Sequence, residues 1–265
     1  MRPEDNKAIL KEGRESLKNT ARKWFSITED AASNEEIRSR LLSGGKITGT
    51  NMCVMVCAII IASVGLNTDS VAVIIGAMLI SPLMGSILAT AYGVVANDGY
   101  LVKKHLAGFG FQIAASMVTA MIYFLLSPAK EATAQLIART QPTFFDVLVA
   151  VAGGVAGIIG QTREDKANNI IPGVAIATAL MPPLCTCGYS IANGEWQMFL
   201  GALYLFVINA YLIFSSATVV LSALRIPKVK AMTDEEWNRI RRRMLRNTII
   251  LIIPSIAAVV SIYMK

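Results

Sequence analysis

Charged side chains are scarce in this sequence, and long stretches have none at all. Only 16% of the 265 residues are Asp, Glu, Lys or Arg, whereas 54% are hydrophobic and the mean hydropathy is +0.53. A water-soluble domain of this size needs a charged surface, so the composition excludes one. The apolar residues form blocks of roughly 18–26, the length that crosses a bilayer as a helix. The sequence therefore predicts an all-α integral membrane protein with the lipid bilayer as its surroundings.

Groups that perform chemistry inside a membrane are scarce as well. The apolar blocks contain no carboxylate pair, basic ladder or His-rich cluster, which argues against a proton pump, a voltage sensor and an intramembrane metalloenzyme. His105, the only histidine, stands beside two lysines at the edge of an apolar block, where an interfacial role is favoured over a proton relay. No glycine-rich phosphate loop occurs in the charged segments. We predict a protein that is not an enzyme and uses no cofactor and no metal.

The four cysteines all lie inside apolar blocks, at Cys53, Cys57, Cys185 and Cys187. Pairs at these spacings can bind a soft metal or form a disulfide, but small packing residues are the commoner use. We interpret all four as packing residues.

Seven apolar blocks are long enough to be transmembrane helices. We expect spans at 51–67, 70–96, 105–127, 144–161, 170–191, 197–222 and 247–264. With a cytoplasmic N-terminus, 22 of the 25 Lys and Arg residues fall in cytoplasmic segments, and only Lys130, Arg139 and Lys265 fall outside. Such an excess marks the inner side of a membrane. The pattern predicts an external C-terminus, and it explains the net charge of +7 without a nucleic-acid partner.

The remaining segments complete the predicted organisation. Residues 1–46 are expected to form a cytoplasmic amphipathic helical segment, and 225–246 a basic amphipathic helix lying on anionic lipid. Residues 33–36 and 233–236 match the capping-box pattern. Leu10, Leu17 and Trp24 recur every seven residues, as in a contact with a second subunit of a homo-oligomer. The membrane part divides into 47–127, an external linker 128–143, 144–224 and a final helix at 247–265.

Two proline-bearing blocks recur about a hundred residues apart. "AMLISPLMGS" occupies 77–86 and "TALMPPLCTC" occupies 178–187, and a shift of 101 residues places Asn67 on Asn168, Leu79 on Leu180 and Pro82 on Pro183. Each copy contains three spans, an odd number, so the second copy enters the membrane from the opposite side. We interpret the pattern as an inverted three-plus-three repeat, a design that is typical of transporters.

The prolines predict interrupted helices near the middle of the membrane. Ser81 is a favoured N-cap and Pro82 suits the first position of a new helix, while Pro182 and Pro183 mark the second break. Helix N-termini attract anions and the negative ends of dipoles. The candidate substrate-binding residues are Ser81, Pro82, Gly85, Ser86, Thr90, Thr178, Pro182, Pro183, Thr186 and Gly188. The alternative is a proline kink that only fits neighbouring helices.

Other polar residues are weaker candidates. Asn67, Asp69, Asn168 and Asn169 line opposite vestibules or, as is favoured, cap the spans that follow them. Gln112 and Asn209 lie within predicted spans, where amides often join helices.

The stretch "GLNTDSVAVIIGAMLISPLMGSILATAYGVVANDG" (65–99), followed by "ATALMPPLCTCG" (177–188), resembles a prokaryotic family of conserved hydrophobic membrane proteins of unknown function, the domain of unknown function 389 type. The resemblance implies a multi-span helical bundle in a prokaryotic cell membrane. It implies no substrate and no catalytic residue.

The sequence thus predicts a seven-span transporter or channel for a small solute, anionic or neutral, bound between two proline-broken helices of opposite direction. The alternative is a membrane scaffold or sensor that uses its cytoplasmic helices to bind a partner.

Overall fold

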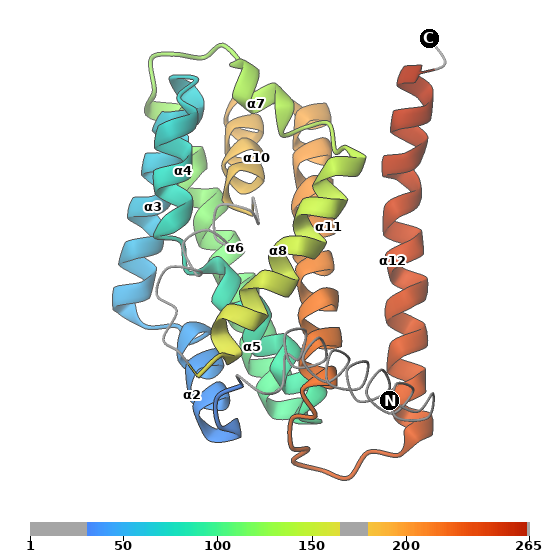
Figure 1. The fold of residues 1–265 in the computed structure, drawn as a ribbon. Helices are drawn as coiled ribbons and strands as arrows, with labels where there is room; N and C mark the ends of the chain where they lie inside the picture. The colour runs from blue at the N-terminus through green and yellow to red at the C-terminus, as the bar shows by residue number, and fades with distance from the viewer. Residues whose placement is uncertain (1–30, 165–179, 264–265) are drawn as a thin grey trace, which may run out of the picture.

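The computed structural model describes residues 31–164 and 180–263, and these residues form helices joined by short connections (Figure 1). The helices are α2 (Asn34–Gly44), α3 (Gly49–Asn67), α4 (Val71–Leu79), α5 (Leu83–Val95), α6 (Gly99–Leu126), α7 (Ala134–Ala138), α8 (Phe144–Thr162), α10 (Met181–Asn193), α11 (Trp196–Ala223) and α12 (Asp234–Tyr263).

The described residues confirm the all-helical fold, and several of the helices have the length and composition of membrane spans. Four of them, α3, α6, α8 and α11, are long and apolar enough to cross a bilayer, and the bent pair of α4 and α5 makes a fifth span if it is counted as one. They correspond to the predicted spans at 51–67, 105–127, 144–161, 197–222 and 70–96. The block predicted at 170–191 lies partly outside the described residues, which include only α10 of it.

The predicted span at 70–96 consists of two helices that meet at an angle of 45°. α4 ends at Leu79 and α5 begins at Leu83. Pro82 occupies the N-cap position of α5, one residue later than the predicted arrangement, in which Ser81 was the cap. The Ser81 hydroxyl still accepts a hydrogen bond from the Leu83 N–H at 3.4 Å, which is the capping interaction expected of a serine before a helix.

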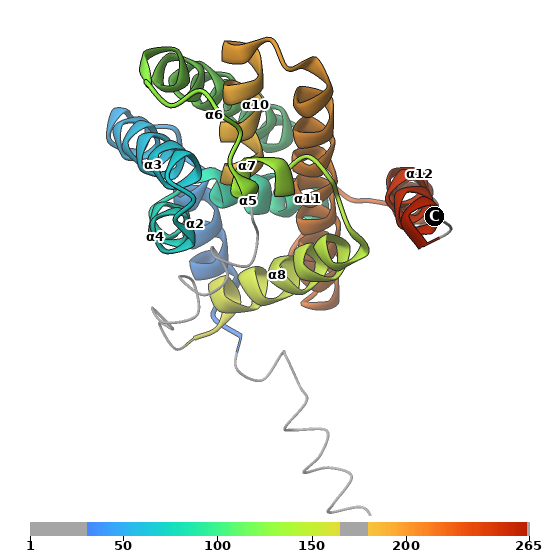
Figure 2. The ribbon, with the colours of Figure 1, turned by 90° about the horizontal axis from the view of Figure 1, so that it is seen from above.

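Two long helices organise the bundle. α6 and α11 have 28 residues each, and both of the 13-residue helices, α5 and α10, pack against both of them. In Figure 1, α5 lies in the lower half of the bundle and α10 in the upper half, so the two short helices occupy opposite ends of the same framework. Figure 2 shows α3 and α8 at the edge of this framework.

The helix α2 lies within residues 1–46, which the sequence predicts as a cytoplasmic amphipathic helical segment, and it packs against the bundle. Its side chains Ile37 and Leu41 are almost completely buried. The Arg40 guanidinium donates to the Arg163 carbonyl at 2.6 Å, which ties α2 to the end of α8. The predicted cap is present, since the Ser33 hydroxyl accepts from the Glu36 N–H at 3.3 Å. The two apolar side chains that fix the position of α2 are too few to produce a clear amphipathic pattern.

Glycine allows α2 to reach α5 closely. A Cβ at Gly85 would lie 2.0 Å from the carbonyl oxygen of Gly44, so only glycine fits at this crossing. An equivalent close approach exists at the other end of the bundle, where a Cβ at Gly201 would lie 2.2 Å from the Thr140 carbonyl oxygen. Arg139 precedes Thr140 in the chain. Burial lowers the pKa of its guanidinium, and the charge of Asp146 opposes this shift.

The helix α12 joins two segments that the sequence analysis treats separately. The basic helix predicted within 225–246 and the span predicted at 247–264 form one continuous helix from Asp234 to Tyr263, which stands beside α11 instead of bending onto a surface (Figure 1). The Tyr211 hydroxyl donates to the Met244 carbonyl at 2.8 Å and the Tyr204 hydroxyl to the Leu251 carbonyl at 2.5 Å, on both sides of the predicted junction. The sequence Arg246-Asn-Thr248 contains no helix breaker, so the helix continues through it.

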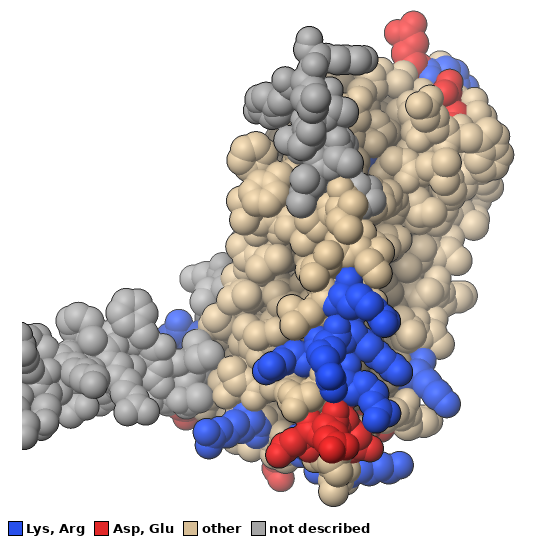
Figure 3. Space-filling model, turned by 90° about the vertical axis from the view of Figure 1, so that its right-hand side faces the viewer, with Lys and Arg blue, Asp and Glu red and all other residues tan. Residues whose placement is uncertain are grey.

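The N-terminal end of α12 carries most of the visible positive charge. Figure 3 shows a blue cluster on this end of the helix. The exposed basic side chains there are Arg239, Arg241, Arg242, Arg243 and Arg246. The predicted capping box is confirmed, because the Thr233 N–H donates to Glu236 at 3.0 Å and the Glu236 N–H donates to the Thr233 hydroxyl at 3.2 Å.

We expect Gly85→Ala to lower the stability of the purified protein in detergent by about 1–3 kcal/mol, because the new methyl group collides with the backbone of α2. Thermal unfolding measures the change. Gly76→Ala is the matched control, since no atom lies within 4 Å of its Cβ position. Equal melting temperatures for the two variants would contradict the close crossing of α2 and α5.

Candidate functional site

The N-terminal half of α5 presents a buried hydroxyl to the middle of α6. Ser86 is fully buried, and its hydroxyl donates to the Gln112 side-chain oxygen at 2.8 Å. One turn later, the Thr90 hydroxyl donates to the Ser86 carbonyl at 2.8 Å within the same helix. α5 therefore joins α6 through a polar contact between side chains that lie deep inside the protein.

The helix α10 repeats part of this pattern. Pro182 and Pro183 lie in its first turn, where the missing N–H group costs no helical hydrogen bond. The Thr186 hydroxyl donates to the Pro182 carbonyl at 3.0 Å, and the Ser190 hydroxyl donates to the Thr186 carbonyl at 2.8 Å. Both helices thus carry a proline, then a hydroxyl residue and a second hydroxyl residue four positions later.

Two buried amides stand at matching positions of the two long helices. Gln112 is the fourteenth residue of α6 and Asn209 the fourteenth of α11, and they are 1% and 2% exposed. One turn before them, the rings of Phe109 and Phe206 stack with centroids 5.9 Å apart and an angle of 25° between their planes. The two long helices therefore meet through equivalent residues near the middle of their lengths.

The two amides differ in how their oxygens are used. The Gln112 oxygen accepts from Ser86, whereas the Asn209 oxygen is buried and has no hydrogen-bond partner among the described residues. A buried polar atom without a partner costs roughly 1–3 kcal/mol. The Ser215 hydroxyl oxygen of α11 is also buried without a partner among the described residues, so Asn209 stands apart by its amide group and by its place at the middle of the helix.

The predicted substrate-binding residues fall into two groups, one on α5 and its preceding connection and one on α10. Gly85 and Gly188 are used for helix packing, since a Cβ on Gly188 would lie 2.5 Å from the Ala120 Cβ of α6. Thr90 and Thr186 bond to carbonyls of their own helices. Thr178 lies outside the described residues. The structure thus gives these residues packing and hydrogen-bonding partners, and their role in binding stays a prediction.

The vestibule candidates that are described connect the segments at one end of the bundle. The Asn67 amide donates to the Ser127 hydroxyl at 2.6 Å, which joins α3 to the end of α6. The Asp69 carboxylate accepts from the Gln135 N–H at 3.0 Å and so caps α7, not the span that follows it. Asn168 and Asn169 lie outside the described residues.

The cysteines divide by exposure. Cys185 and Cys187 are fully buried, whereas Cys53 and Cys57 are exposed, and all four are free thiols. Within the described ranges, no group of His, Cys, Asp and Glu side chains is arranged to hold a metal ion.

Sequence reasoning treated Gln112 and Asn209 only as residues that join helices. A signal for their correspondence was present in Phe109-x2-Gln112 and Phe206-x2-Asn209, a shift of 97 residues. The shift of 101 residues that aligns Pro82 with Pro183 does not align Gln112 with Asn209, because the connections between the elements differ in length.

The model of the family described as Domain of unknown function (DUF389) matches residues 78–215. The chain belongs to the DUF389 family. The matched region begins in α4 and ends in α11, so it includes the bend, both 13-residue helices and both buried amides.

This DUF389 chain is similar to an uncharacterized protein of Methanocaldococcus jannaschii, with 29% identity over 202 residues. The alignment covers 76% of this chain and 62% of that relative, so the chain spans less than two thirds of the relative's length. No solved structure matches.

We expect Ser86→Ala to destabilise the protein by about 1–3 kcal/mol, because the Gln112 oxygen is then buried without a donor. Adding Gln112→Leu should recover part of the loss, since neither partner is then polar. Thermal unfolding of the two single variants and the double variant gives the coupling between the sites. Thr90→Val is the control, because its hydroxyl bonds only within α5. Strictly additive effects at 86 and 112 would contradict the contact.

Proposed function

We propose that this DUF389 protein moves a small polar solute across the membrane and binds it near the midplane, between α5 and α10. The observation that carries the proposal is the buried, unpartnered oxygen of Asn209 in the middle of α11. Such an atom is costly in a core that only needs to pack, and a bound solute would supply its missing donor.

The architecture supports the same proposal. The helices α3 and α8 have 19 residues each, α5 and α10 have 13 each, and α6 and α11 have 28 each. These equal lengths, in the same order, support an inverted repeat of two three-span units, with α12 added outside it. In transporters built this way, interrupted helices provide the binding site where the two units meet.

The buried polar side chains indicate the chemistry of the solute. Within the described residues they are hydroxyls, amides and one imidazole, with no carboxylate among them. A cation would lack a counter-charge in such a site, whereas hydroxyls, amides and helix N-termini can hold a neutral or anionic solute. We therefore propose a neutral or anionic solute with several hydrogen-bonding groups, at least one of which is an O–H or N–H donor for the Asn209 oxygen.

The described conformation has no open path at the two hydroxyls, since Ser86 and Thr186 are both 0% exposed. We interpret it as a closed state of the transport cycle. For the topology we propose what the distribution of basic residues predicts. The protein would have seven spans in a prokaryotic inner membrane, with a cytoplasmic N-terminus and an external C-terminus. We also propose that the protein assembles as a homo-oligomer.

Flux into proteoliposomes tests the function. We expect uptake of one or more members of a panel of neutral metabolites and anions, and a loss of about tenfold in Asn209→Leu, the value of roughly one hydrogen bond of 1.4 kcal/mol. The melting temperature of this variant should be unchanged or higher, because it removes an unpaired polar atom. Asn238→Leu, at an exposed amide on α12, is the matched control and should leave uptake unchanged. Absence of flux for every solute would contradict transport and favour a membrane scaffold or sensor.

Thiol labelling tests access to the site. In a chain whose four cysteines are replaced by alanine, Ser86→Cys and Thr186→Cys should react slowly with small aqueous thiol reagents and faster when a transported solute drives the cycle, because both positions are buried in the closed state. Lys228→Cys, at an exposed position, should react at once in every condition. Full protection of both buried positions during transport would contradict a midplane pathway.

A further inference from the structure

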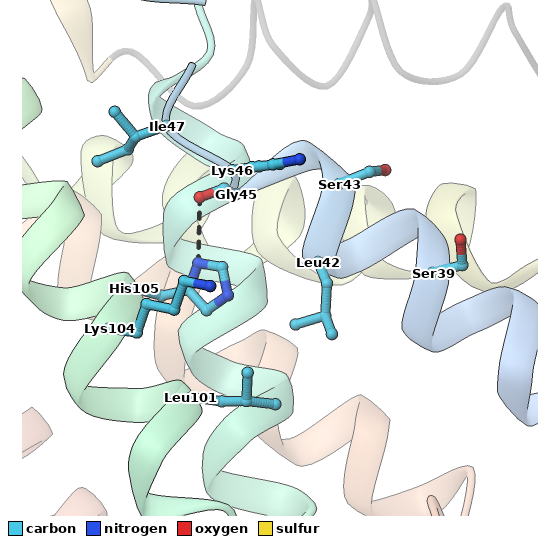
Figure 4. Close-up of a pocket in the computed structure, with 9 residues that line it drawn as sticks. All are labelled: Ser39, Leu42, Ser43, Gly45, Lys46, Ile47, Leu101, Lys104 and His105. Carbon is cyan, nitrogen blue, oxygen red and sulfur yellow. Dashed lines mark hydrogen bonds between the residues drawn. The ribbon is translucent and has the colours of Figure 1, made fainter.

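A pocket of about 450 Å³ lies between α2, the connection to α3 and the first turns of α6 (Figure 4). Its volume falls within the roughly 300–1,000 Å³ of ordinary small-molecule sites. The residues that line it are Ser39, Leu42, Ser43, Gly45, Lys46, Ile47, Leu101, Lys104 and His105. It is separate from the midplane region, and none of its residues belongs to the candidate solute site.

The charge in this pocket has one sign. Lys46 and Lys104 bring two ammonium groups from two different segments, and no Asp or Glu lines the pocket. The Ser43 hydroxyl already donates to the Arg40 carbonyl at 2.9 Å, so Ser39 is the hydroxyl best placed to donate to a ligand. Ammonium and hydroxyl donors together suit an anion with several oxygens, and they suit a cation poorly.

The buried floor of the pocket is held in place by His105. The imidazole is 5% exposed, and its Nδ1 lies 3.1 Å from the Gly45 carbonyl oxygen, as the dashed line in Figure 4 shows. A carbonyl only accepts, so Nδ1 carries the proton, and the bond joins α6 to the connection that bears Lys46. A Cβ at Gly45 would lie 2.9 Å from Nδ1, so this approach requires glycine.

The walls are fixed by contacts that do not involve a ligand. Gly44 meets Gly85 of α5, and Arg40 bonds to the end of α8, so α2 cannot move away from α6 without breaking both. The lining also includes the apolar side chains of Leu42, Ile47 and Leu101. A preformed pocket with a polar part and an apolar part loses little entropy when it binds a ligand that has both.

We propose that this pocket binds a phosphate group that is attached to a small organic body. Lys46 and Lys104 would pair with the phosphate oxygens, and the apolar residues would contact the attached group. The phosphate can belong to a lipid headgroup or to a soluble phosphorylated compound. The site does not depend on the proposed transport, because its residues belong to α2, to the connection between α2 and α3 and to the first turns of α6, and none of them is a candidate solute residue.

Calorimetric titration of the full chain in a neutral maltoside detergent tests the site. The probes are glycerol 3-phosphate, inorganic phosphate and dihexanoyl-phosphatidylglycerol, with dihexanoyl-phosphatidylcholine as the zwitterionic comparison. We expect glycerol 3-phosphate or dihexanoyl-phosphatidylglycerol to bind more tightly than inorganic phosphate, and Lys104→Ala to weaken that binding about tenfold through the loss of one charge-assisted contact. Binding of inorganic phosphate alone would overturn the part of the proposal that concerns the attached group. Lys46→Ala should act similarly. Binding of the lipid probe alone identifies a headgroup, and binding of the soluble probes alone identifies a soluble ligand.

Lys103→Ala is the matched control, because Lys103 is the neighbouring exposed lysine on α6 and does not line the pocket. It should change the affinity by less than about twofold, because its side chain does not line the pocket and would make no direct contact with a bound phosphate. Equal weakening by Lys103→Ala and Lys104→Ala would overturn the proposal in favour of general surface attraction. Failure of all three phosphate probes to bind the unmodified chain would overturn it as well.

Discussion

The structure depends on one constraint, that backbone N–H and C=O groups inside a bilayer must be paired within the protein. The bend between α4 and α5 meets this constraint locally. The N–H groups of Ile80 and Ser81 donate to carbonyls three residues earlier, at 3.3 Å each, and the Gly85 N–H donates to the Pro82 carbonyl at 3.2 Å. The Ser81 hydroxyl accepts from the Leu83 N–H, so the chain changes direction by 45° while the N–H groups of Ile80, Ser81, Leu83 and Gly85 all have partners.

The same need to pair polar groups explains why few polar side-chain atoms remain available to bind a solute. Hydroxyls inside helices usually bond to a carbonyl of the preceding turn, and Thr90, Thr186 and Ser190 all do so. An amide has both a donor group and an acceptor and cannot be satisfied by one such bond. Gln112 finds Ser86 on a neighbouring helix, whereas the Asn209 oxygen finds no partner, and it thereby becomes the leading candidate for solute contact.

At the end of the bundle that carries α2, close backbone contacts add to the packing of Ile37 and Leu41. Gly44 against Gly85 brings α2 directly to the first turn of α5, next to Ser86, and Gly45 against His105 holds the adjacent connection to α6. The proposed phosphate pocket and the Ser86 hydroxyl are therefore both supported by consecutive glycines of one short segment, Gly44 and Gly45. This arrangement makes α2 a structural part of the membrane domain.

The sequence by itself determined the features that depend on neighbouring residues: the apolar spans, the interruption around Pro82, and the caps at Ser33 and Thr233. Each of these follows from hydropathy, backbone geometry or a hydrogen bond within four positions along the chain. The tertiary structure decided the docking of α2, the pairing of Ser86 with Gln112, the unpaired state of Asn209 and the pocket around His105. Those features arise between segments far apart in sequence, where the path of each helix, set by glycine contacts and by the bend, decides which side chains meet.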